Sequence, residues 1–177
     1  MTKTKWTIDP THSSIEFSVK HMMIAKVKGS FNDFTANVTA DPADLTTADI
    51  EFTIQAASID TRNEDRDNHL RSADFFDTEN NPVITFKSTD IKKTDEDEYD
   101  VTGDVTILGV TRPETFSITF EGQGQDPWGN TKAGFSGKGK IKRSDFGLTW
   151  NSALETGGVL VGDQITISLE FEAAPEA

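Results

Sequence analysis

Three histidines, His12, His21 and His69, are the side chains in this sequence best suited to holding a metal ion. Imidazole is a common metal ligand, and Asp9 or Asp67 could add a carboxylate. The spacing of the histidines, however, contains neither a His-x-His nor a His-x₃-His pair. We therefore expect them to cap turns or to hydrogen-bond at strand ends, and we predict no metal and no cofactor.

The sequence shows no motif for covalent or hydrolytic catalysis. Gly-x-Ser-x-Gly, the nucleophile motif of many serine hydrolases, is absent. With 30 acidic residues, some carboxylates must lie close together by chance, so they do not indicate a glycosidase. The segment from Gly134 to Gly139 resembles a phosphate-binding loop, but we expect a strand there because no helix follows it. We predict no catalytic residues and no enzyme activity.

Arg66, His69 and Arg71 form a cationic cluster that could hold the polar end of a ligand. Alternatively, the two arginines pair with nearby acidic side chains, which are Glu64, Asp65, Asp67 and Asp74. Further along the chain, Arg143 and Asp145 are expected to form a structural pair that fixes the turn before Phe146.

The elements that position these residues are mainly strands, because apolar and polar residues alternate along most of the chain. In one segment Tyr99, Val101, Gly103, Val105 and Ile107 share one face. A long bent strand is expected from about residue 25 to residue 40, with a bulge near residues 32–33. Residues 58–81 break the alternation, so we predict a short helix and loop there. The pattern predicts an all-β fold, an eight-stranded antiparallel barrel with the helix and loop covering one mouth.

The composition predicts that this barrel is hollow and apolar inside. The chain has 12 phenylalanines, 13 glycines and one tyrosine. Glycines at the inner positions suggest space kept for something that lies against the backbone. An eight-stranded barrel can hold one small ligand, and an apolar lumen favours a long aliphatic or prenyl chain. The alternative is that the rings pack against one another as an ordinary core.

The predicted ligand contacts are apolar side chains of the inner faces and the loop, together with the cationic cluster. They are Phe17, Val19, Phe34, Phe52, Ile54, Phe75, Phe76, Phe86, Phe116, Ile118, Phe135, Trp150, Arg66, His69 and Arg71.

Size and charge limit the remaining classes. At 177 residues the chain fits a single domain, residues 1–177, with a disordered tail over 173–177. A net charge of −13 disfavours nucleic acid and anionic membrane surfaces as partners. The sequence has no stretch of about 18 consecutive apolar residues, so we predict no integral membrane segment. Because the first residues show no signal peptide, we expect a cytoplasmic protein, or an exported one if a leader was removed.

Several motifs, in order along the chain, resemble the YceI-like family. They are Trp6-Thr-Ile-Asp-Pro-Thr-His-Ser13, Phe17-Ser-Val-Lys-His21, Ser58-Ile-Asp-Thr61, the segment from Asp67 to Asp77, Pro82-Val-Ile-Thr-Phe-Lys-Ser88, Leu108-Gly-Val-Thr-Arg-Pro113 and Arg143-Ser-Asp-Phe-Gly-Leu148. The resemblance covers about residues 5–173. It implies a lipocalin-like barrel whose members bind polyisoprenoids or other long-chain lipids, often as homodimers. Many relatives are exported.

Three functions stay open at this point. The first is binding of a long-chain ligand, such as a polyisoprenoid, an isoprenoid quinone or a fatty-acid-derived lipid, for transport, storage or sensing. The second is an enzyme that acts on an isoprenoid lipid, which would need a polar constellation inside the cavity. The third is a stress-related scaffold protein whose cavity is incidental. The inner faces contain few polar residues, so binding is the preferred hypothesis.

Overall fold

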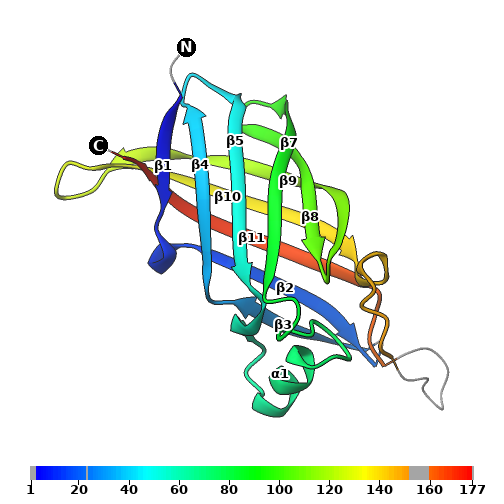
Figure 1. Cartoon of the computed structure of the whole chain (residues 1–177). Helices are drawn as coiled ribbons and strands as arrows, with labels where there is room; N and C mark the ends of the chain where they lie inside the picture. Colours follow the sequence, from blue (N-terminus) through cyan, green and yellow to red (C-terminus); the bar gives the residue numbers. More distant parts are fainter. Residues whose placement is uncertain (1–2, 23, 152–159, 177) are drawn as a thin grey trace.

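The chain folds into a closed barrel of eight antiparallel strands (Figure 1), which confirms the predicted fold class. This computed structural model describes residues 3–22, 24–151 and 160–176. Neighbouring strands follow the order β1, β4, β5, β7, β8, β9, β10 and β11, and β11 pairs back to β1. The barrel strands are β1 (Thr4–Ile8), β4 (Phe34–Asp41), β5 (Asp44–Gln55), β7 (Val83–Asp95), β8 (Glu98–Ile107), β9 (Val110–Gln125), β10 (Thr131–Lys142) and β11 (Gln164–Pro175).

Further elements gather at one end of this barrel. Strand β11 pairs with β2 along its first half and with β1 at its last residues. The sheet continues from β2 through β3 to β6. In Figure 1 the helix α1 lies at this end, below the barrel, and the turn between β4 and β5 lies at the other. These elements are β2 (Ser14–His21), β3 (Ala25–Phe31), β6 (Ile59–Asp60), α1 (Glu64–Arg71) and the 3₁₀ turns η1 (Pro10–His12), η2 (Ala56–Ser58) and η3 (Arg143–Phe146).

The hairpin of β8 and β9 shows how the alternating sequence builds the wall. Val101 and Val105 are buried on the inner face. On the outer face the hydroxyls of Thr102 and Thr115, cross-strand neighbours, lie 2.7 Å apart within hydrogen-bond distance. Because side chains of a strand alternate between its two faces, each apolar residue inside has a polar neighbour outside.

The long strand predicted over residues 25–40 is instead two strands, so the predicted bulge is wrong. β3 pairs with β2, whereas β4 pairs with β1 and β5. The chain changes partners at Asn32 and Asp33, where local polar bonds replace the ladder. The Asn32 amide oxygen accepts from the Ser30 hydroxyl at 2.8 Å, and the Asp33 carbonyl accepts from the Gln55 amide at 2.9 Å. A bulge and a change of strand partner have the same sequence pattern.

The disordered tail predicted for residues 173–177 is also wrong for the described residues 173–176. Ala173 is buried beside Trp6, and Ala174 pairs with Thr7. The backbone amide of Glu176 donates to the Lys5 carbonyl at 2.8 Å. The position of these residues at the end of the chain suggested disorder. The edge of β1 needs a partner to close the barrel, however, and the tail supplies it.

Inner glycines allow large side chains to lie flat against the barrel wall. A Cβ atom added to Gly103 would lie 2.5 Å from the Phe86 ring, and one added to Gly137 would lie 2.5 Å from Ile118. The Phe116 ring covers Gly139 even more closely. The space beside these glycines therefore holds neighbouring side chains of the protein, rather than being kept for a ligand as the sequence suggested. Because the rings lie along the wall, the middle of the lumen stays open.

Replacing Gly139 with alanine tests this packing. The new methyl group would collide with the Phe116 ring and force it inward, so we expect unfolding free energy to fall by about 1–3 kcal/mol. Gly134→Ala on the same strand is the control, because its nearest neighbour would be Glu121 Cβ at an ordinary 3.6 Å. Chemical denaturation measures both variants. Equal stability of the two would contradict the proposed role of Gly139.

Candidate ligand-binding site

A cavity of about 640 Å³ runs inside the barrel. This volume falls within the range of small-molecule sites, about 300–1,000 Å³. Its walls are mainly aliphatic and aromatic side chains, and several inward rings contact one another; those of Phe52 and Phe171 have centroids 4.9 Å apart. The barrel is therefore not filled by its own core.

The helix end of the cavity is closed by buried side chains. Ile59 and Phe75 border the cavity and are 1% and 8% exposed. Phe76 borders it too, and its ring meets the Phe31 ring edge-on at a centroid distance of 5.8 Å. Adjacent phenylalanines can both face inward because the chain here is a turn and not a strand. The predicted closure of one mouth by the helix and loop is thus confirmed.

The opposite end of the cavity is bordered by exposed residues. They are Pro42 and Ala43 in the turn between β4 and β5, Lys93 and Asp97 in the hairpin of β7 and β8, and Gln123 near the end of β9. In Figure 1 both of these connections lie at the top, away from α1. Solvent therefore meets the cavity at this mouth.

A buried carboxylate anchors the helix that closes the other end. Asp67 is 6% exposed, and its Oδ1 accepts hydrogen bonds from the Thr61 amide at 2.9 Å and from the Thr61 hydroxyl. Asn63 caps the helix by accepting from the Arg66 amide at 3.0 Å. The bonds of Asp67 tie α1 to Thr61, the residue that follows β6, and so hold the helix over this end of the barrel.

The cationic cluster does not border the cavity. The Arg66 guanidinium donates to the Thr61 carbonyl at 2.7 Å, and that of Arg71 donates to the carbonyls of Ala57 at 2.9 Å and Ile59 at 3.2 Å. The two arginines therefore hold backbone carbonyls, and neither forms an ion pair with a carboxylate among the described residues. The sequence suggested acidic partners for the two arginines, because it does not show which backbone carbonyls of the folded loop lack a hydrogen-bond donor.

Most of the predicted apolar contacts do line the cavity. They are Phe17, Val19, Phe52, Ile54, Phe75, Phe76, Phe86, Phe116, Ile118 and Phe135. Phe34 does not border the cavity, but its ring packs beside the lining, with its centroid 6.4 Å from that of Phe52. Trp150 packs on the outer side of Phe75 at 5.3 Å, and His69 meets Trp150 edge-on at 4.8 Å.

Several lining residues were missed in the sequence-based set. They include Trp6, Ile15, Val105, Ile107, Ile165, Ile167, Leu169 and Phe171. Their signal was present, because they occupy the same alternating faces as the residues that were chosen.

Arg143 lies at the closed end, and the predicted pair with Asp145 is wrong. Asp145 instead faces Arg112 at 3.5 Å. The Arg143 guanidinium donates to the carbonyls of Leu148 at 2.7 Å and Gly162 at 2.9 Å. The side chain is 5% exposed, and this burial lowers its pKa. Its bonds join η3 to the segment just before β11.

Comparison with known proteins agrees with this architecture. The model of the YceI-like domain matches residues 6–173. The chain belongs to the YceI-like domain family. A UPF0312 protein of Staphylococcus epidermidis is 45% identical over 98% of this chain and 96% of its own length.

Solved structures give the same result for the YceI-like fold. BcnA of Burkholderia cenocepacia superposes with a TM-score of 0.82 at 28% identity, covering 94% of this chain and 99% of that one. A polyisoprenoid binding domain from Saccharophagus degradans superposes with a TM-score of 0.69 at 12% identity, covering 98% and 99%. The second match is a likeness of fold alone. Within the described residues, no helix has the length and apolar character required to cross a membrane.

The three histidines of this YceI-like chain are not brought together. His12 lies in η1, His21 pairs with Ala25 at the end of β2, and His69 lies in α1 with its ring nitrogen 2.9 Å from Asp74. None of them borders the cavity.

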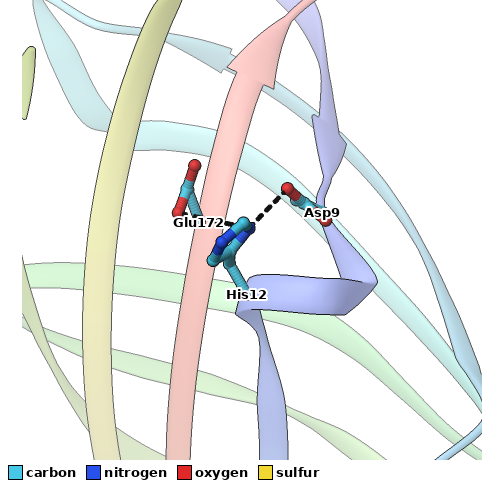
Figure 2. Close-up of side chains that lie close together, drawn as sticks. All are labelled: Asp9, His12 and Glu172. Carbon is cyan, nitrogen blue, oxygen red and sulfur yellow. Dashed lines mark hydrogen bonds and ion pairs between the residues drawn. The ribbon is translucent and has the colours of Figure 1, made fainter. Parts of the chain in front are cut away.

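His12 does meet two carboxylates outside the barrel, those of Asp9 and Glu172 (Figure 2). Its Nδ1 lies 2.9 Å from Asp9 and 3.8 Å from Glu172. Within the described part of the chain, this is the one place where three side chains that could bind a metal ion have their ligand atoms within 4.8 Å of one another. Asp9 also accepts from the Thr11 amide at 2.9 Å, so the group caps the turn before β2.

The first prediction from this site concerns the buried anchor of the cap. Asp67→Asn removes the charge that holds Thr61, and we expect unfolding free energy to fall by about 1–3 kcal/mol. Asp65→Asn, on the exposed side of the same helix, is the matched control and should change stability little. Thermal or chemical unfolding measures both. If Asp67→Asn behaves like the control, the helix is not held by this carboxylate.

The second prediction concerns pH. The hydrogen bond to Asp9, together with nearby Glu172, raises the pKa of His12 above 6.5, and His12 with Thr11 holds the pKa of Asp9 well below 3.8. The contribution of His12 to folding stability is therefore present below pH 6.5 and is lost as pH rises through its raised pKa. The contribution of Asp9 is present above pH 3.8 and is lost as pH falls through its lowered pKa. We expect His12→Gln to lower the melting temperature more at about pH 5.5 than at about pH 8.5. An equal loss at both pH values would contradict the ion pair.

Proposed function

We propose that this YceI-like protein binds a long-chain apolar ligand, such as a polyisoprenoid, an isoprenoid quinone or a fatty-acid-derived lipid, inside the barrel for transport, storage or sensing. The observation that carries the proposal is the apolar cavity of about 640 Å³, closed at α1 and open between the β4–β5 turn and the β7–β8 hairpin. A chain-shaped ligand suits a cavity that follows the length of a barrel.

The energetics of such binding come from apolar burial. Each methylene transferred from water contributes about 0.8 kcal/mol, so a chain of about twenty methylenes contributes about 16 kcal/mol, which is enough to offset the cost of immobilising a ligand, about 4–15 kcal/mol. The wall needs no specific polar contact to supply this energy. A polar metabolite would lose its hydration without gaining hydrogen bonds, because few polar groups border the cavity.

The family supports the proposal in general terms. The Saccharophagus degradans domain, which shares this fold, is described as polyisoprenoid binding. That description agrees with the proposal that the barrel of this chain holds a long apolar chain.

Among the described lining residues, binding is favoured over the two alternatives. No serine or histidine borders the cavity, and the two carboxylates that do border it, those of Glu16 and Asp97, are exposed. The apolar interior therefore offers an enzyme acting on an isoprenoid no evident pair of nucleophile and base. A scaffold function does not explain a large open lumen, since incidental voids lower stability and protein interiors are normally close-packed.

The experiment introduces a charge into the lumen. Ile167 lines the cavity in mid-strand, whereas its neighbour Ser168 is exposed on the outer face. We expect wild type and Ser168→Arg to carry a long-chain lipid after detergent-free purification, and Ile167→Arg to carry much less. Native mass spectrometry measures the bound mass, with Ile167→Trp as a second variant that narrows the lumen without adding charge. If wild type neither retains nor takes up any long-chain lipid, the proposed function is wrong.

A further inference from the structure

Two cationic side chains among the described residues border the cavity, and they lie at opposite ends. Arg143 is at the closed end and is already bonded to the carbonyls of Leu148, Val161 and Gly162. Lys93 is at the mouth and is exposed. The charge that is available to a ligand is therefore the one at the mouth.

The strand register places Lys93 on the inner face. On β7 and β8, Ile91 pairs with Val101, and both are buried cavity-lining residues. Two residues further toward the mouth, Lys93 pairs with Tyr99, which also lines the cavity. Because residues two apart on a strand share a face, Lys93 and Tyr99 continue the inner lining to the rim.

The Lys93 amine has no carboxylate partner among the described residues. Lys92 lies 3.8 Å from Asp90 and Lys87 lies 3.7 Å from Glu51, but no described acidic oxygen lies within 4.0 Å of the Lys93 amine. An unpaired amine at the rim of an apolar lumen offers a charge-assisted hydrogen bond to an anion.

Resting on the proposed function, we propose that the ligand is an amphiphile with a carboxylate head group, which enters tail-first and leaves the carboxylate at Lys93. The tail then lies toward Phe75 at the closed end. Tyr99 and Gln123 add a hydroxyl and an amide donor at the same rim. A single negative charge fits better than a phosphate, because Asp97 shares the mouth and repels a doubly charged group.

The orientation is testable with the tryptophans of the protein. Trp6 lines the mouth half of the cavity, packed with Ala40, and Trp150 packs on Phe75 at the closed end. Trp128, which is 82% exposed, is replaced by phenylalanine together with one of the other two. Stearic acids carrying a nitroxide near the carboxylate or near the methyl end then serve as fluorescence quenchers.

We expect the carboxylate-end nitroxide to quench Trp6 more strongly and the methyl-end nitroxide to quench Trp150 more strongly. The reverse pattern, or no dependence on nitroxide position, would overturn the tail-first orientation.

The head-group contact is tested by Lys93→Met with Lys92→Met as the matched control on the opposite face. We expect Lys93→Met to lower the affinity of the protein for the nitroxide-labelled stearate about fivefold, which corresponds to an exposed ion pair of about 1 kcal/mol. Because salt screens an exposed charge, this loss of affinity should become smaller at high salt. The methyl ester of the labelled stearic acid should bind to wild type and to both variants with the same affinity. Lys92→Met should bind the acid with the affinity of wild type.

Equal weakening of acid and ester by Lys93→Met, or no weakening of either, would overturn the carboxylate contact while leaving chain binding intact. If wild type binds neither the acid nor the ester, the proposed function itself fails.

Discussion

The close packing of aromatic rings on inner glycines is the interaction on which the rest of the structure depends. An eight-stranded barrel can be filled by its own side chains, and twelve phenylalanines would be ample material. Here the rings of Phe86 and Phe116 lie over Gly103 and Gly139 instead of reaching the barrel axis. The wall is therefore well packed while the centre stays open, and stability does not require the lumen to be filled.

The two ends of the barrel then take different roles. At the closed end, polar groups are used up within the protein, as Asp67 holds Thr61 and Arg143 holds backbone carbonyls. At the mouth, exposed side chains border the lumen and Lys93 keeps its amine free of carboxylates among the described residues. This difference between the two ends matches an amphiphilic ligand, whose apolar chain would lie inside the barrel while its charged group stays in water at the mouth.

Much of the fold could be predicted from the sequence because the period-two alternation is strong. It predicted the closed barrel, the helical interruption and the apolar faces, and it placed Phe52 and Phe86 on the lining. It could not separate β3 from β4, since Asn32 and Asp33 fit both a bulge and a change of partner. Pairing of residues 173–176 with β1 depends on contacts across nearly the whole chain.

The candidate site was predicted less completely for a different reason. Arg66 and Arg71 lie among acidic residues in the sequence, yet they bond to carbonyls that only the folded loop exposes. Lys93 carries no sequence signal, because its importance lies in its register opposite Tyr99 at the cavity rim. Charge proximity along the chain is a weak guide where backbone groups compete for the same donors.

Calorimetric titration with a series of straight-chain lipids of increasing length tests the central claim most directly. If the lumen binds an extended chain, the binding free energy should become more favourable by about 0.8 kcal/mol for each added methylene until the cavity is full, and should then stay constant. Binding should also show a negative heat-capacity change, because apolar surface is buried. An affinity that does not depend on chain length would contradict the account, because the cavity would then take no part in binding.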